Sequence, residues 1–371
     1  MTPSGNRYFP GDHPGLRALL DRYLAGMSER LAASQFARET AFLLLAGGYG
    51  RGEGGVFYGE NGPALYNDLE FYLVLKTGTA REAAQRWCEQ ESHHGEEETG
   101  IEVEFKILPL AALRRAEPSM FYYDLAAANI PVFGCPNLPE RLSDGARIPA
   151  HEAARLLFNR GSGLFYARLL LAEGGDRNFV ERNHAKARLA FADAVLALNG
   201  RYDWSCRARH ERLSEPLAQK PPNFSKLAVW HESAVDFKFH PRYENPPLNV
   251  LRERQEELLS AWNDLFLWLE SIRLKHAFAS GRDYAAYGGR LFPEFPALRN
   301  LALHLRDSLR RRKRPGGDWF DYPRAPLQRA LALLLQPDVD LPRVCLLLSL
   351  PRGSSMEQIH EAYRRWWRFY N

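Results

Sequence analysis

Acidic residues separated by a single residue occur twice in the first part of the chain. Asp68 and Glu70 stand in one expected strand, and Glu102 and Glu104 stand in another. Side chains two positions apart on a strand project from the same face, roughly 6–7 Å apart. Carboxylates held this closely repel one another unless a cation lies between them, and oxygen-rich sites suit Mg²⁺. The spacing therefore predicts a metal site made by both strands.

Such a site is suited to in-line displacement at phosphorus. One metal ion activates the attacking hydroxyl, and another holds the triphosphate and the leaving oxygen. The third carboxylate is either Glu102 or Glu104, because both share the exposed face of the later strand. Glu104 is the better candidate, since it lies deeper in the strand, between Val103 and Phe105.

A glycine-rich segment, Gly47–Glu53 (GGYGRGE), follows directly after an expected buried strand, Ala41–Ala46. Glycines allow backbone N–H groups to come close to a phosphate, and the guanidinium of Arg51 can bind a phosphate bidentately. The segment also fits the dinucleotide pattern G-x-G-x-x-G, but that pattern requires a crossover helix after it. The following residues are rich in Gly and Pro, so no crossover helix is expected there and a dinucleotide-binding site is disfavoured. The segment is not a P-loop either, because the G-K-[ST] ending is missing.

Taken together, AGGYGRGE, NDLEFYLV and VEF resemble the polymerase-beta-like nucleotidyltransferase superfamily, in particular its small-substrate members. Gly47 and Gly48 match the family's Gly-[Gly/Ser] pair, and Asn67–Glu70 is similar to its S-D-[IL]-[DE] pattern. The resemblance covers roughly residues 41–108, under a fifth of the chain. The spacing between the two motifs is longer than usual, which predicts an inserted hairpin or flap around Phe57–Ala64.

The resemblance implies an Mg²⁺-dependent enzyme that transfers a nucleoside monophosphate from an NTP, with ATP expected, to a hydroxyl of a small-molecule or protein acceptor. It assigns catalysis and the binding of two Mg²⁺ ions to Asp68, Glu70 and Glu104. The alternative is a non-catalytic nucleotide-binding or regulatory module on the same fold, since members that have lost catalysis exist.

The resemblance also implies nucleotide contacts outside the acidic residues. It implies that Gly47 and Gly48 contact the nucleotide. It also implies that Lys186, in the expected helix Phe179–Leu198, is similar to a phosphate-binding lysine of the family's helical domains. Arg51 is a further candidate phosphate ligand. The alternative for Lys186 is a solvated position on an amphipathic helix.

Charge and periodicity divide the chain near residue 149. Residues 1–150 contain 14 Lys and Arg against 20 Asp and Glu, whereas the remainder is basic. We expect an α+β protein with a small mixed-sheet nucleotidyltransferase domain over residues 1–148. An all-helical substrate-binding half follows over residues 149–371, and it could divide into two subdomains near residue 285. The charge contrast places the expected nucleotide between the two parts.

Local patterns predict the individual elements of both parts. Strands are expected over 69–75 and 101–108, and a polar loop is expected over 91–100. Apolar residues at helical spacing predict these helices: 15–33, 79–90, 156–171, 179–198, 250–278, 298–312 and 358–370.

Composition restricts the cellular location and the kinds of partner that we expect for this protein. The four cysteines lie far apart without a C-x-x-C pair, which favours a reducing compartment and argues against structural zinc. The start of the chain lacks a signal-peptide pattern and no transmembrane segment is expected, so we expect a cytoplasmic protein with no membrane partner. A net charge of +4 without a continuous basic stripe disfavours nucleic acid, although Arg310–Arg314 and Arg364–Tyr370 are basic enough to be considered.

Overall fold

The chain folds into two compact units, which follow the sequence only in part. The computed structural model describes residues 7–310 and 316–370. The first unit contains Met1–Glu152, Leu196–Gln219 and Ser225–Glu244, and the second contains Ala153–Val195, Lys220–Phe224 and Asn245–Asn371. A small mixed sheet lies in the N-terminal half and helices fill the C-terminal half, which confirms the predicted α+β class.

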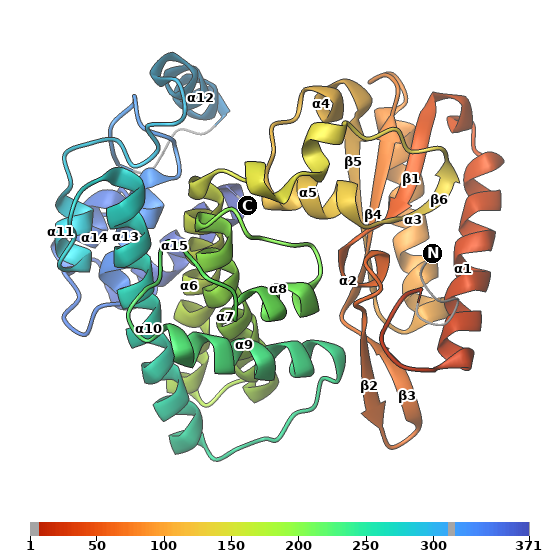
Figure 1. Ribbon diagram of the computed structural model, residues 1–371. Helices are drawn as coiled ribbons and strands as arrows, with labels where there is room; N and C mark the ends of the chain where they lie inside the picture. The colour runs from red at the N-terminus through yellow and green to blue at the C-terminus, as the bar shows by residue number, and fades with distance from the viewer. Residues whose placement is uncertain (1–6, 311–315, 371) are drawn as a thin grey trace. The chain divides into compact units, whose positions relative to one another are not determined.

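The main sheet of the first unit has four strands in the order β5-β4-β1-β6. Their bounds are Thr40–Leu45 for β1, Asp68–Leu75 for β4, Glu102–Pro109 for β5 and Ile130–Gly134 for β6. β4 and β5 are parallel, whereas β1 runs antiparallel to both β4 and β6. The acidic strands β4 and β5 are therefore direct neighbours (Figure 1).

Helix α3 (Arg81–Thr99) connects the two parallel strands, so the prediction of a polar loop over residues 91–100 is wrong. A parallel connection needs a crossover, which is usually a helix. The polar residues continue the helix because their buried members have partners: Glu91 accepts two hydrogen bonds from the guanidinium of Arg30, on α1 (Pro14–Ala32). Gly95 lets the hydroxyl of Tyr23 approach closely, since a Cβ there would lie 2.2 Å from that oxygen.

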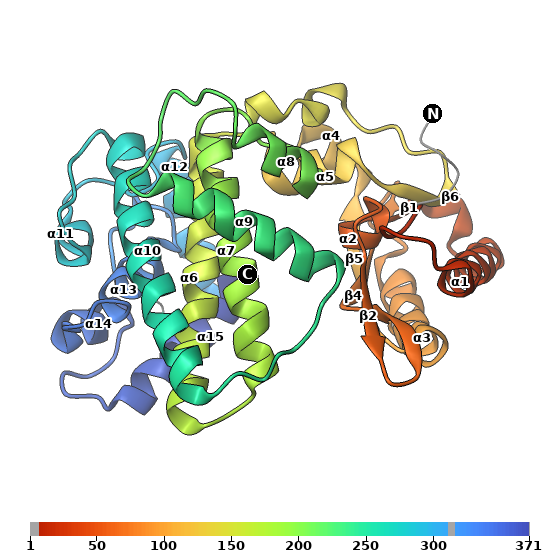
Figure 2. The same ribbon diagram turned by 60° about the horizontal axis from the view of Figure 1, so that its bottom comes forward.

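Each face of the sheet has its own apolar core. Helices α1 and α3 cover one face, where they pack on alternate residues of β1 and β4 (Figure 2). The opposite face is covered by α4 (Leu110–Arg115), α5 (Met120–Ala127) and the short 3₁₀ helix Glu140–Ser143. This second face also contains Asp68 and Glu70, which precede the buried Tyr72 and Val74 along the same side of β4.

The expected hairpin is present between the glycine segment and the acidic strand. It consists of β2 (Gly55–Gly59) and β3 (Gly62–Tyr66), which form a separate two-stranded sheet. The glycine segment itself forms a one-turn helix, α2 (Gly47–Gly50). The first unit further contains α8 (Cys206–Arg212), α9 (Phe224–Phe239), and the 3₁₀ turns Ala37–Glu39 and Gly145–Arg147.

The second unit is helical within the described residues. Its elements are α6 (Ala150–Glu173), α7 (Arg177–Leu198), α10 (Leu248–Leu274), α11 (Gly281–Ala286), α12 (Ala297–Arg310), α13 (Ala325–Leu334), α14 (Leu341–Leu347) and α15 (Met356–Tyr370). Helices α6 and α10 meet closely at Gly161, where a Cβ would lie 2.6 Å from the indole of Trp262. That indole donates a hydrogen bond to the carbonyl oxygen of Leu157.

The structure describes only one of the two basic segments considered in the sequence over most of its length. Most of Arg310–Arg314 lies outside the described residues. The aromatic residues of α15 pack inward: Trp366 is buried, and the buried hydroxyl of Tyr363 is hydrogen-bonded to Ser162. Among the described residues, no helix is both long and apolar enough to cross a membrane.

Candidate metal centre

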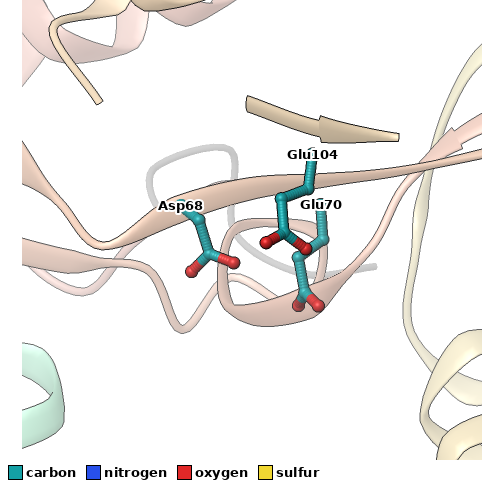
Figure 3. Close-up of side chains that lie close together, drawn as sticks. All are labelled: Asp68, Glu70 and Glu104. Atoms are coloured by element: carbon teal, nitrogen blue, oxygen red, sulfur yellow. The ribbon is translucent and has the colours of Figure 1, made fainter. Parts of the chain in front are cut away.

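Pairing of β4 with β5 brings the acidic residues together. The parallel register sets Asp68 beside Glu102, Glu70 beside Glu104, and Tyr72 beside Lys106. Residues paired in this way point to the same side of the sheet. Figure 3 shows the side chains of Asp68, Glu70 and Glu104 projecting from one side of the two strands.

Asp68, Glu70 and Glu104 each contribute one carboxylate oxygen to a group whose members all lie within 4.8 Å of one another. Within residues 7–310 and 316–370 this is the one group of three or more potential metal ligands, and Glu102 does not belong to it. Opposite oxygens around Mg²⁺ are separated by about 4.2 Å, since each metal–oxygen distance is roughly 2.1 Å. Small side-chain rotations would therefore bring the three oxygens around one hard cation, which the donor set fits.

Gly47 makes room for this group. Its φ of +60° lies in the left-handed region, and a Cβ there would lie 2.0 Å from Oε2 of Glu70. A side chain at Gly48 is less constrained, because its Cβ would lie 3.4 Å from the carbonyl oxygen of Glu53. The first glycine of the pair is thus required by the acidic strand itself, and contacts of either glycine with a nucleotide stay a prediction.

Asn67 turns the chain from the hairpin into β4. It has a φ of 77°, a conformation that Asn adopts more readily than most residues. Its side-chain amide donates a hydrogen bond to Oδ1 of Asp68. Asn67 therefore orients the first acidic residue.

Burial and neighbouring charges raise the pKa of Glu70 above its ordinary value. Desolvation is the largest cause of the raised pKa, and the charges of Asp68 and Glu104 add to it, whereas Lys106 and Arg51 oppose the shift. All three raising effects disfavour a bare carboxylate. The site therefore favours either a proton or a cation at Glu70.

Lys106 is a further residue of the site, and it is not among the site residues expected from the sequence. Its Nζ lies 3.8 Å from Oε1 of Glu70 and 3.4 Å from the hydroxyl of Tyr72. The signal for it was available in the sequence, because Glu102, Glu104 and Lys106 alternate along one face. What was missing was the register that sets Lys106 beside Tyr72.

Arg51 has carboxylate partners of its own. Its Nη1 lies 3.1 Å from Oδ2 of Asp124, on α5, and its Nε lies 3.8 Å from Oε2 of Glu53. The side chain is only 16% exposed. Phosphate binding by Arg51 stays a prediction, and it would require the guanidinium to share or exchange these partners.

Glu53 ends the glycine segment and joins it to α8 and α9. Its Oε1 accepts the backbone N–H of Cys206 at 2.7 Å, and its Oε2 accepts a hydrogen bond from Lys238. Although burial alone favours the protonated acid, Lys238, Arg209 and Arg51 lower the pKa of Glu53 to about 2. Glu53 thus serves as an ionised anchor for two helices that follow it by more than 150 residues in the sequence.

Tyr49 fastens the hairpin to the glycine segment. Its buried hydroxyl lies 2.9 Å from the carbonyl oxygen of Gly55 and 3.0 Å from that of Tyr66, which share its single proton, and it accepts the N–H of Tyr66. Gly54 has no side chain where the Tyr49 ring lies, since a Cβ would be 2.3 Å from that ring. These contacts therefore fix both ends of the hairpin, where the chain leaves α2 and where it enters β4.

Lys186 belongs to the second unit, on α7, whereas the acidic group lies in the first. Its contact with a nucleotide, and the position of that nucleotide between the two parts of the chain, stay predictions. No protein-family model matches the sequence, and no curated protein matches it.

Proposed function

We propose that the chain is an Mg²⁺-dependent nucleotidyltransferase that transfers a nucleoside monophosphate from an NTP, ATP first, to a hydroxyl of a small-molecule or protein acceptor. The observation that carries the proposal is the convergence of Asp68, Glu70 and Glu104 within 4.8 Å on neighbouring parallel strands. The glycine turn supports it, because Gly47 lies directly against the Glu70 carboxylate and glycine backbone N–H groups can approach a phosphate closely.

The proposed reaction is an in-line displacement. The acceptor oxygen forms a bond to the α-phosphorus while the bond from that phosphorus to the bridging oxygen breaks, and pyrophosphate leaves with the electron pair. Mg²⁺, when bound, neutralises charge on the phosphates. Asp68 and Glu70 would hold both Mg²⁺ ions and, through them, the triphosphate. Glu104 would bind the catalytic ion and assist removal of the proton from the acceptor hydroxyl.

Transfer of label from α-³²P-labelled NTPs to a library of sugars, aminoglycosides and hydroxyl-bearing peptides tests this proposal. We expect Mg²⁺-dependent label transfer with release of pyrophosphate by the wild-type protein, and its loss in Asp68→Asn. At least half of the wild-type rate in Asp68→Asn would overturn the two-metal assignment. Nucleotide binding that is indifferent to Mg²⁺ and yields no product would favour the non-catalytic binding module.

The proposal includes a cytoplasmic location. The four cysteines are free thiols in the structure, and the cytoplasm supplies both reducing conditions and ATP. Fractionation of cells that express a tagged chain would test this placement.

A further inference from the structure

Lys106 is a cationic residue that forms an ion pair with one member of the acidic group. In the part of the chain that the structure describes, its ion pair with Glu70 is the one salt bridge made by Asp68, Glu70 or Glu104. Its Nζ also lies 5.6 Å from the centroid of the Tyr72 ring. The ammonium therefore lies beside the Glu70 carboxylate, close enough to repel a divalent ion bound there.

The contacts of Lys106 are loose enough to be exchanged. The separation of 3.8 Å from Glu70 exceeds a hydrogen bond, and the 3.4 Å contact with the Tyr72 hydroxyl is long. The Lys106 side chain is 52% exposed, and a lysine stem has four flexible carbons. By contrast, Arg51 is largely buried between Asp124 and Glu53, so it is a poor candidate for movement.

A divalent ion bound by Glu70 and the ammonium of Lys106 repel each other, and this repulsion must weaken metal binding. A triphosphate changes the balance because its oxygens can accept the ammonium and share the metal at the same time. Two ligands that relieve each other's unfavourable contacts bind with positive coupling.

We propose that Lys106 couples metal binding to triphosphate binding: its ammonium opposes the divalent ion at Glu70 when no nucleotide is present, and pairs with a phosphate oxygen when one is. This inference rests on the proposed function, since it takes an NTP as the ligand. Its consequence is that metal and nucleotide enter the site together, and the free protein holds divalent ions weakly.

Binding of Mn²⁺, followed by electron paramagnetic resonance, tests the inference without relying on turnover. The titration is run with Mn²⁺ alone and with Mn²⁺ plus α,β-methylene-ATP, whose α–β linkage cannot be cleaved. The variants are Lys106→Gln, the charge-conserving Lys106→Arg, and the control Lys76→Gln. Lys76 follows the far end of β4 and donates a hydrogen bond to the carbonyl oxygen of Arg38, so its substitution removes the same charge at a distance.

We expect Lys106→Gln to bind Mn²⁺ alone about three- to tenfold more tightly than the wild type. The factor by which the ATP analogue tightens Mn²⁺ binding should fall by a similar amount, as linkage requires. Lys76→Gln and Lys106→Arg should remain within about twofold of the wild type in both titrations.

The outcomes separate this inference from the proposed function. Equal Mn²⁺ affinity in Lys106→Gln and the wild type, with the analogue still bound in a metal-dependent way, overturns the role of Lys106 and leaves the nucleotidyltransferase proposal standing. Tighter Mn²⁺ binding by Lys106→Gln, with no binding of the analogue by any variant, overturns the nucleotide proposal and the coupling with it. A tightening that Lys76→Gln reproduces assigns the effect to net charge and also overturns the inference.

Discussion

The carboxylate of Glu70 occupies the space that a side chain at Gly47 would fill. A Cβ on Gly47 would lie 2.0 Å from Oε2 of Glu70, and the glycine has a φ of +60°. The turn after β1 and the acidic residue of β4 are therefore fitted to each other: neither the backbone conformation nor the close approach is open to another residue type without movement. This contact accounts for a glycine at position 47 before any ligand is considered.

Gly47→Ala tests this contact. We expect a stability loss of about 1–2 kcal/mol from the left-handed backbone alone. Displacement of Glu70 should also weaken Mn²⁺ binding about tenfold, which corresponds to about 1.4 kcal/mol. Gly48→Ala is the matched control, because its Cβ would meet the Glu53 carbonyl oxygen only at 3.4 Å. Urea unfolding and Mn²⁺ titration of both variants provide the measurement, and equal effects would refute the contact's importance.

Glu104→Gln should damage activity far more than Glu102→Gln. Glu104 pairs in register with Glu70 and belongs to the acidic group, whereas Glu102 pairs with Asp68 and does not. We expect at least about a hundredfold difference in pyrophosphate release, since one carboxylate lost from a reacting centre costs roughly 10²–10⁴ in rate. The reverse order would mean that the third ligand comes from the start of β5.

Arg51→Ala should destabilise the first unit. It leaves the largely buried Asp124 without its ion-pair partner, and breaking a buried pair in this way costs about 3–5 kcal/mol. The double variant Arg51→Ala with Asp124→Asn should recover part of that loss, because no unpaired charge remains. Urea unfolding of the single and double variants measures both effects.

The same pair of variants separates a structural role of Arg51 from phosphate binding. If Arg51 also binds the triphosphate, the double variant should regain stability while its NTP affinity stays about ten- to a hundredfold below the wild type. Wild-type NTP affinity in the double variant would limit Arg51 to its contacts with Asp124 and Glu53.

Glu53 makes stability depend on pH. Its folded-state pKa of about 2 lies below the ordinary 4.5. The stabilisation is therefore complete above pH 4.5, where the unfolded chain is also ionised, and is lost as the pH falls toward 2. A shift of this size corresponds to about 3 kcal/mol. We expect Glu53→Gln to be less stable than the wild type at pH 7, with a difference that shrinks between pH 4.5 and 2.

Urea midpoints measured across this pH range provide the test. Glu60→Gln, at the exposed tip of the β2–β3 hairpin, is the control and should follow the wild type throughout. A stability difference between Glu53→Gln and the wild type that stays constant with pH would show that the carboxylate contributes through shape and hydrogen bonding instead of through its charge.

Much of the site could be predicted because its residues are local in the sequence. Alternation along residues 68–75 and 102–109 is a property of the extended chain, so the shared face of Asp68 and Glu70 followed directly from their spacing. The hairpin was likewise predictable from the length between the two motifs. The continuation of the helix over Glu91–Thr99 could not be predicted. A glutamate such as Glu91 is expected to be exposed unless it is known that Arg30 pairs with it in the fold.

The sequence alone determined which residue types could make the site: two carboxylates on one strand, a pair on another, and a glycine turn that admits a close neighbour. The tertiary structure alone decided which of these meet. Parallel pairing set Glu104 beside Glu70 and Lys106 beside Tyr72, and chain closure over long separations joined Arg51 to Asp124 and Glu53 to Lys238. Strand register and ion pairing depend on the burial of whole faces and of charges, energies that no local window of the chain contains.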